Sequence, residues 1–518
     1  MISQLQSRLE DNRSLRVLAL GLLAIGVGAV GGFVLVAMGN PILPIVLVAG
    51  LVALPWLVTR PMADLLLVAL TATLLPFAAS PVRLAVLTPT LLEVGLLLLY
   101  TSWLLKLLTG SGLRRTPLDV WLVLFVAATL FAFVLGLGRD PSTDVMHNYF
   151  KLVLAMGVFF AVVNIACDWR AVATVLNALI VSGAVQAMLG IALWALPDSR
   201  AAGLLTRLSA IGYPTGRVIR YVEDNPALGE RATGTQVDPN SFGGMLVVVA
   251  TLTGVQLLAR RPLLPRWLLS VMFAAQVGAL VLTQSRAALL GLVAAGALVG
   301  TLRYRRLWVW GAVGAVLIMA LGIGGGYFAR LQAGLRFEDP ANQMRLAEYR
   351  NAMEIIARYP VFGVGFGTAG ELGLTTGVSS IYLTIAERAG LVALALFMAS
   401  IGVFLVSALT AIRASHRPAP GNTQSKAHSP YQSGNAPTLP PAQGSQTGAD
   451  DALDADRRWS VLDSAVLGGT AAVFGALVVG VADHYFFNIE FPHMVALFWL
   501  SAGLAMSARH LLMRADLS

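Results

Sequence analysis

Long apolar runs recur from one end of this chain to the other, and they constrain its fold more than any other feature. Of 518 residues, 57% are hydrophobic and only 12% are charged, whereas an ordinary soluble domain carries about 25% charged residues. The runs are long enough to cross a hydrocarbon core of about 30 Å. A soluble core would interrupt them with polar residues on its solvent faces. The sequence therefore predicts an all-α, polytopic transmembrane helical bundle and excludes a soluble multidomain protein.

We expect about fourteen transmembrane helices, within a range of about 12–14. The predicted spans are 17–38, 42–59, 62–79, 90–108, 118–137, 149–167, 171–196, 241–259, 267–284, 287–302, 307–327, 379–411, 461–482 and 491–510. Arginine and lysine residues in alternate short loops then fall on one side of the membrane, so the positive-inside rule predicts that both termini are cytoplasmic.

The longer connections divide the chain. Two outer loops, 197–240 and 328–378, carry five arginines each. These arginines are either solvated surface charges or the lining of an anion-binding cavity at the outer face. Segment 413–460 is rich in Pro, Gly, Ser and Gln, which predicts a disordered cytoplasmic linker. This linker would separate a transmembrane bundle, 1–412, from a C-terminal transmembrane hairpin, 461–518.

Composition excludes several other classes. The formal charge of +9 does not indicate nucleic-acid binding, because basic residues in membrane proteins mainly set orientation. A single cysteine, Cys167, excludes an intramolecular disulfide and a Cys-based metal site. The sequence contains no internal repeat, which disfavours transporters built from two related halves.

An amphipathic helix is predicted within the second outer loop. Asp339-Pro340 has the pattern of an N-cap followed by proline at the first helical position. Four apolar residues then share one helical face, and Arg345 lies among the charged residues on the other. The apolar four are Leu346, Tyr349, Met353 and Ile356. Pro360 ends this helix, and the glycines that follow, Gly363, Gly365 and Gly367, predict a tight loop back to the bilayer.

Polar residues gather where two spans begin at the outer face. Arg231 and Asp238 precede the span near 241, where Asn240 or Ser241 is predicted to cap the helix, and an outward helix N-terminus attracts anions. Ser285 and Arg286 occupy a tight turn between two further spans. An ionisable residue at such depth indicates a functional site, although snorkelling to the interface is an alternative.

Two further groups lie near the same boundary. Glu387 and Arg388 interrupt the apolar run 379–411, so they are predicted to face the bundle, either as part of a site or as a structural pair. The last outer loop contains His484 within Asp483-His-Tyr-Phe-Phe-Asn-Ile-Glu490. Its aromatic residues are also typical of an interface belt.

Together these stretches resemble the O-antigen ligase/polymerase superfamily. The resemblance is clear over roughly 230–400. It rests on the following motifs: Arg231-Ala-Thr-Gly-Thr, Asp238-Pro-Asn-Ser-Phe-Gly243, Thr283-Gln-Ser-Arg286, Arg345, Pro360-Val-Phe-Gly-Val-Gly-Phe-Gly367, Tyr382-Leu383, Glu387-Arg-Ala-Gly-Leu391 and Asp483-His-Tyr485. The resemblance implies a multi-spanning inner-membrane glycosyltransferase with a large, partly helical periplasmic loop. It would use undecaprenyl-pyrophosphate-linked glycans as donors and a glycan, glycolipid or protein as acceptor, without a metal, a nucleotide sugar or another cofactor.

One position departs from the family pattern. Ligases of the family carry a His-Asn pair shortly before the equivalent of Tyr382-Leu383, whereas this chain has Ser379-Ser380. The departure favours a polymerase of O-antigen or exopolysaccharide repeats over a ligase to lipid A–core or protein. A lipid-linked oligosaccharide flippase or a solute transporter is the alternative from another class.

The resemblance also assigns provisional roles. Arginine binds phosphate oxygens in pairs and stays charged in a low-dielectric site. Arg231, Arg286 and Arg345 are therefore expected to bind the donor pyrophosphate, with Asn240 and Ser285 beside them. The candidates for the base that deprotonates the acceptor are Asp238, His484 and Glu387.

Overall fold

The computed structural model describes residues 59–75, 79–80, 89–110, 112–136, 142–320, 340–367, 377–415 and 444–515. Within these ranges, regular structure is helical apart from one two-stranded hairpin. The predicted polytopic helical bundle is therefore confirmed.

Among the described residues, eight helices are long and apolar enough to cross a membrane. They are α5 (Leu91–Leu108), α6 (Asp119–Gly136), α7 (Thr143–Ile165), α8 (Trp169–Trp194), α10 (Pro239–Leu258), α16 (Ile381–Ala414), α17 (Gly444–Val479) and α18 (Pro492–Ala515). Shorter apolar helices accompany them: α4 (Pro61–Thr73), α11 (Arg266–Leu282), α12 (Arg286–Leu302) and α13 (Arg306–Ala320).

The remaining elements are short or lie outside the spans. They are α9 (Asp198–Arg207), η2 (Leu208–Ile211), β1 (Arg220–Tyr221), η3 (Val222–Asp224), η4 (Pro226–Leu228), β2 (Glu230–Arg231), α15 (Pro340–Arg358) and η8 (Tyr485–Phe487). Strands β1 and β2 pair antiparallel, with Arg220 opposite Arg231.

Several predicted boundaries differ from the structure. The expected span 17–38 lies outside the described residues, and so does 42–59 apart from its last residue. Helix α17 begins at Gly444, so its first turns fall inside the segment predicted as a disordered linker, 413–460. The physical reason is local, because three Ala and two Arg residues within 449–458 favour helix just before the span.

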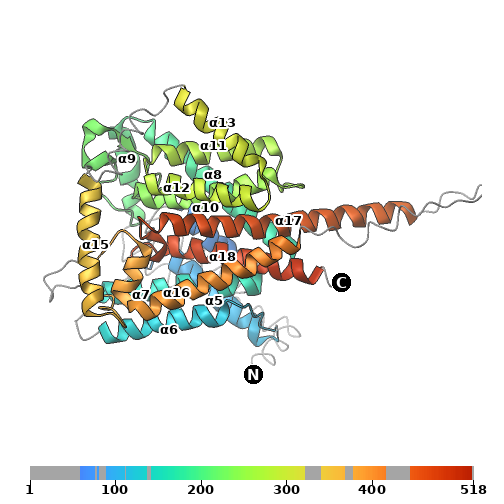
Figure 1. Cartoon of the computed structure of the whole chain (residues 1–518), viewed down its shortest axis with the longest axis horizontal. Coiled ribbons are helices and arrows are strands. Elements are labelled where there is room, and N and C mark those ends of the chain that lie inside the picture. The colour runs from blue at the N-terminus through green and yellow to red at the C-terminus, as the bar shows by residue number, and fades with distance from the viewer. Residues whose placement is uncertain are drawn as a thin grey trace, which may run out of the picture.

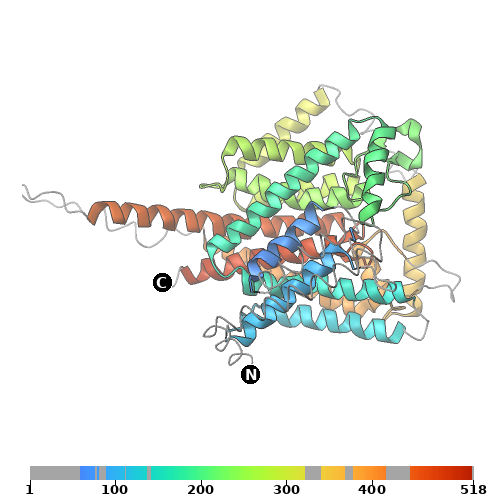
Figure 2. The ribbon, with the colours of Figure 1, turned by 180° about the vertical axis from the view of Figure 1, so that it is seen from behind.

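The bundle has a buried centre and a lipid-facing periphery. In α10, α17 and α18 the apolar stretches are 83%, 89% and 89% buried, whereas those of α5 and α6 are 33% buried. Helices α10, α17 and α18 therefore form the core, and the spans run roughly parallel around them (Figures 1 and 2). Small residues allow close packing, since a methyl group at Gly469 would lie 2.9 Å from the Ala505 side chain.

The two ends of the bundle are different. Helix α15 runs across one end, nearly perpendicular to the spans, and α9 lies at the same end (Figure 1). Helix α17 extends well beyond the bundle at the other end, where the chain also terminates (Figure 2). We call these the α15 end and the far end.

The glycine-rich segment after α15 packs against a break in α16. At Gly390 the backbone turns to φ 84° and ψ 173°, which interrupts the helix inside its apolar run. The loop fills the break: the amide of Val364 donates to the Glu387 carbonyl at 2.9 Å, and that of Leu391 donates to the Pro360 carbonyl at 2.8 Å. Gly363 has a φ of 64°, and a side chain there would meet the carbonyl of Glu387. Residues 359–367 thus form a tight turn that is hydrogen-bonded to both sides of the break in α16.

Candidate functional site

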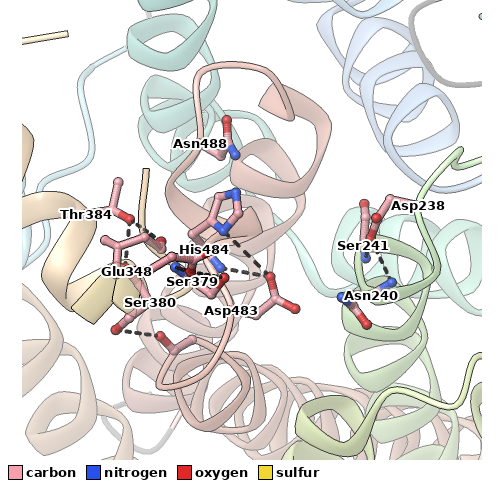
Figure 3. Close-up of polar contacts among 12 residues, drawn as sticks. Asp238, Asn240, Ser241, Glu348, Ser379, Ser380, Thr384, Asp483, His484 and Asn488 are labelled. Atoms are coloured by element: carbon pink, nitrogen blue, oxygen red, sulfur yellow. Dashed lines mark hydrogen bonds and ion pairs between the residues drawn. The ribbon is translucent and has the colours of Figure 1, made fainter. Parts of the chain in front are cut away.

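The loop between α17 and α18 places a buried acid at the α15 end. Asp483 is only 3% exposed, and its Oδ1 accepts the backbone N–H of His484 at 2.9 Å. Its Oδ2 is buried without a hydrogen-bond partner in the described part of the chain. Figure 3 shows this loop facing the start of α10, with Asp483 on the side nearest Asp238 and Asn240.

Burial and a second carboxylate favour the protonated form of Asp483. Burial is the larger cause and the charge of Asp238 is the next, and together they raise the pKa of Asp483 to about 7. The positive charges of Arg345 and Arg231 act in the opposite direction. Asp483 therefore titrates near neutrality.

Asp238 is the N-cap of α10. Its Oδ1 accepts the backbone N–H groups of Asn240 and Ser241, at 2.8 and 3.0 Å. The prediction that Asn240 or Ser241 caps this helix is wrong. Pro239 occupies the first helical position, so Asp238 keeps an extended backbone from which its carboxylate reaches the free N–H groups. Burial raises the pKa of the Tyr485 phenol, and the nearby negative charge of Asp238 acts in the same direction.

Arg231 is held in a fixed position beside this cap. Its Nε donates to the carbonyl of Thr283 at 2.8 Å, and one terminal nitrogen donates to Oδ1 of Asn240 at 2.5 Å. Burial lowers the pKa of Arg231, while Asp238, Tyr485 and Asp483 act to raise it. Two of its five N–H donors are thus used within the protein. The others can meet a ligand.

A second arginine, which the sequence analysis did not single out, comes from the hairpin. Arg220 on β1 lies opposite Arg231 on β2. Its Nε is buried without a hydrogen-bond partner among the described residues, and its charge acts to lower the pKa of Tyr485. In the sequence, the hairpin that positions Arg220 is indicated only by one glycine within the short segment 220–231.

Helix α15 turns a polar face toward the same loop. Met353, predicted to lie on its apolar face, is 57% exposed. The buried positions of the helix are Ala352, Ile355 and Ile356, so the face packed against the bundle is rotated by about one residue from that apolar face. Arg345, predicted among the charged residues on the rest of the helix, is half-buried.

Two further residues of α15 bind the segment that leads into α16. Glu348 Oε2 accepts the amide and the hydroxyl of Ser379, at 3.0 and 2.8 Å. The hydroxyl of Tyr349 donates to the carbonyls of Ser379 and Val481, at 3.1 and 3.3 Å. Neither residue was proposed as a site residue from the sequence, because their contacts depend on which side of α15 faces the bundle.

His484 lies between these groups. Burial lowers the pKa of its imidazole, the negative charges of Asp238 and Glu348 raise it, and the positive charges of Arg345 and Arg388 lower it. The ring stacks on Tyr485, with centroids 4.9 Å apart, and its Nδ1 is 3.9 Å from Oδ1 of Asp483. An imidazole that is neutral at neutral pH can accept a proton.

The other predicted site residues lie close by but have structural contacts. Glu387 is 1% exposed and accepts the amide of Gly377 at 3.2 Å. Ser285 caps α12 by accepting the amide of Ala288 at 3.4 Å. Arg286 is half-buried at the first position of α12. Strand β2 runs beside this turn, since the amide of Ala232 donates to the Leu282 carbonyl at 2.9 Å.

This cluster, which we call the Asp483 cluster, consists of Arg220, Arg231, Asp238, Asn240, Arg345, Glu348, Asp483, His484 and Tyr485. It combines fixed cations, which can bind an anion, with an imidazole and carboxylates that can exchange protons. In the described ranges, no group of three or more His, Cys, Asp and Glu side chains has an arrangement suited to a metal ion.

Fold and cluster together define a class: a multi-spanning helical membrane protein with a charged site beneath a surface helix. Residues 268–398 match the family model described as O-antigen ligase, and this match confirms the resemblance to the O-antigen ligase/polymerase superfamily over that segment. A search of curated proteins finds no match. The matched segment includes Arg286, Arg345 and Glu387. At this coarse level the match supports an O-antigen ligase-type membrane glycosyltransferase.

Proposed function

We propose that the protein polymerises undecaprenyl-pyrophosphate-linked glycan units at the periplasmic face of the bacterial inner membrane. The observation that carries this proposal is the convergence of Arg220, Arg231 and Arg345 on the loop that contains Asp483 and His484. Both termini would then be cytoplasmic, because the α15 end faces the periplasm.

The arginines supply the donor site. The departing lipid pyrophosphate carries negative charge that increases as the glycosidic bond breaks, and preorganised cations stabilise it without reorganisation. Arg231 is already oriented by Asn240 and Thr283. The carbonyl of Thr283 accepts a hydrogen bond from Arg231, and Arg286 follows Thr283 by about one turn in the chain. Arg286 is therefore the fourth candidate for binding the pyrophosphate. Because guanidinium groups supply the positive charge, the reaction is proposed to need no metal.

His484 is the favoured base. An acceptor hydroxyl gives its proton to the imidazole, the hydroxyl oxygen forms a bond to the anomeric carbon, and the bond to the pyrophosphate oxygen breaks with both electrons on the leaving group. Asp238 is less suited, because its carboxylate caps α10 by accepting two backbone N–H groups. Glu387 is less suited because it holds the amide of Gly377.

The surroundings of Ser379 favour a polymerase over a ligase. This serine stands where family ligases carry a histidine, and its segment contacts the His484 loop: the Ile381 amide donates to the Asp483 carbonyl at 3.1 Å. An imidazole from the last loop therefore lies next to the position of the missing one. The alternatives are an O-antigen ligase that transfers glycan to lipid A–core or protein, and, from another class, a flippase or solute transporter.

Reconstitution tests the proposal directly. Purified protein in liposomes, supplied with an undecaprenyl-pyrophosphate-linked repeat unit, should produce longer glycans, and chelation by EDTA should not stop it. Arg231→Ala and Arg286→Ala should each abolish chain growth while the protein still inserts and accumulates. Arg217→Ala is the matched control, because Arg217 is exposed and pairs with Asp224 at 3.4 Å. Transfer of single units only to a glycolipid would indicate a ligase, and movement of the donor without bond formation would indicate a flippase.

A further inference from the structure

A charged hollow lies at the far end of the bundle, away from the Asp483 cluster. It has a volume of about 740 Å³ and is lined by the turn between α12 and α13, residues 301–307, together with Leu258 and Trp310. Helix α12 begins at Arg286 near the cluster and runs away from it, so its C-terminal turn lies at the opposite end of the bundle (Figure 1). The volume is within the range of about 300–1,000 Å³ that is usual for sites of small ligands.

The rim of this hollow is strongly basic. Arg303 is held in place, because it forms an ion pair with Asp463 at 3.1 Å and stacks over Trp459 at 5.4 Å. Arg305 and Arg306 are exposed, and no carboxylate of the described residues lies within ion-pair distance of either. At the mouth of the hollow, two consecutive positive charges therefore have no carboxylate partner within the described ranges.

The wall below the arginines is apolar. Leu258, Leu302, Leu307 and Trp310 line it. Helix α13 continues this surface outward, since Trp310 is 69% exposed and its neighbours Trp308 and Val309 are 55% and 62% exposed. Tryptophan at such a position is typical of the membrane–water interface. The hollow thus joins a cationic rim to an apolar, lipid-facing wall.

We infer that this hollow binds the headgroup of an anionic phospholipid of the inner leaflet. Arginine forks at Arg305 and Arg306 bind the phosphate oxygens in pairs, and the acyl chains lie along α13. Basic pockets between spans at the cytoplasmic side bind anionic headgroups in this way. The site is separate from the glycosyl-transfer site, and only its assignment to the inner leaflet rests on the orientation given in the proposed function.

Lipid binding to the full-length protein tests this inference. Protein freed of lipid in a neutral detergent is titrated with phosphatidylglycerol or with phosphatidylcholine, and bound lipid is counted by native mass spectrometry. We expect phosphatidylglycerol to bind more tightly. The double variant R305Q/R306Q should lose about tenfold in affinity for phosphatidylglycerol or more, since each arginine near an anionic headgroup contributes measurably. Binding of phosphatidylcholine should not change.

Two controls make the result decisive. R350Q/R358Q removes two exposed arginines of α15 at the opposite end and should leave phosphatidylglycerol binding unchanged. Inorganic phosphate should compete only weakly, because it lacks the acyl chains. Full competition by inorganic phosphate, or unaltered binding to R305Q/R306Q, would overturn the inference. So would equal binding of the two lipids to the unaltered protein, a comparison that does not depend on how any variant folds.

Discussion

Glu348 on α15 binds both donors of Ser379, the backbone amide at 3.0 Å and the hydroxyl at 2.8 Å. Ser379 leads into α16, and the next residues are hydrogen-bonded to the loop that carries Asp483, through the Ile381 amide and the carbonyls of Gly480 and Asp483. A surface helix is thereby connected to the proposed catalytic loop through one short segment. The position of α15 and the position of His484 should consequently be coupled.

Removing the carboxylate of Glu348 should reduce catalysis more than it reduces folding. In Glu348→Ala both Ser379 donors lose their acceptor, so the segment beside His484 becomes free to shift, and small displacements of reacting groups cost about 10²-fold in rate. We expect chain growth in liposomes to fall by a comparable factor while the protein accumulates normally. Glu354→Ala, an exposed acid on the same helix, is the control. Equal activity of the two variants would show that this contact has no role.

The orientation of Arg231 should depend on Asn240. Asn240→Ala removes the acceptor at 2.5 Å from the guanidinium but leaves the Thr283 carbonyl and all charges in place. Preorganised donors lose much of their effect when they must reorient, so we expect a fall in kcat of about 10-fold or more. Asn225→Ala, which removes the cap of η4 in the same outer region, should leave the rate unchanged. The measurement is the initial rate of glycan elongation, and a rate equal to that of the control would contradict the prediction.

The raised pKa of Asp483 predicts a pH-dependent stability. Its pKa is about 7 in the folded protein against an ordinary value of 3.8. Between these values the folded state keeps a proton that the unfolded state has lost, so stability falls as the pH rises through this window. Asp483→Asn cannot ionise and should lack this dependence. The measurement is the melting temperature of both proteins at about pH 5 and about pH 8. The difference, variant minus wild type, should be larger at the higher pH. An equal difference at the two pH values would contradict it.

The sequence was sufficient for the fold class because the membrane restricts the alternatives. With no water in the hydrocarbon core, every backbone group must be paired within the segment, so long apolar runs form helices. The amphipathic helix was also predictable, since Pro340 and Pro360 mark its ends. The rotation of this helix was not predictable. Apolar spacing placed Met353 on the apolar face, but it does not show which residues pack against the bundle, and Arg345 is half-buried while Met353 is exposed.

The site was predictable in part. Arg231, Asp238, Asn240, Arg345 and His484 were selected as polar residues beside the lipid boundary, and the structure brings them together. What the sequence could not supply was the pairing between distant segments. Arg220 reaches the cluster only because of the pairing register of a hairpin with two-residue strands. Glu348 reaches it only because of the rotation of α15 about its axis. Likewise, Gly390 in an apolar run carried no sign that α16 is broken there.

That break gives a final prediction about stability. Gly390 has a φ of 84°, a conformation that costs a residue with a side chain about 1–3 kcal/mol. A methyl group there would also collide with the carbonyl of Val361, which belongs to the loop that fills the break. Gly390→Ala should therefore lower the melting temperature and the yield of folded protein.

Gly402→Ala in the same helix is the matched control. Gly402 is exposed, and an added methyl group meets nothing within 4 Å in the described structure, so alanine should be neutral or stabilise the helix by up to about 1 kcal/mol. Fluorescence-detected size-exclusion chromatography after heating measures both variants. If Gly390→Ala melted like Gly402→Ala, α16 would have to be continuous. The glycine loop after α15 would then have no site to fill, and the connection between that loop and the Asp483 cluster would be lost.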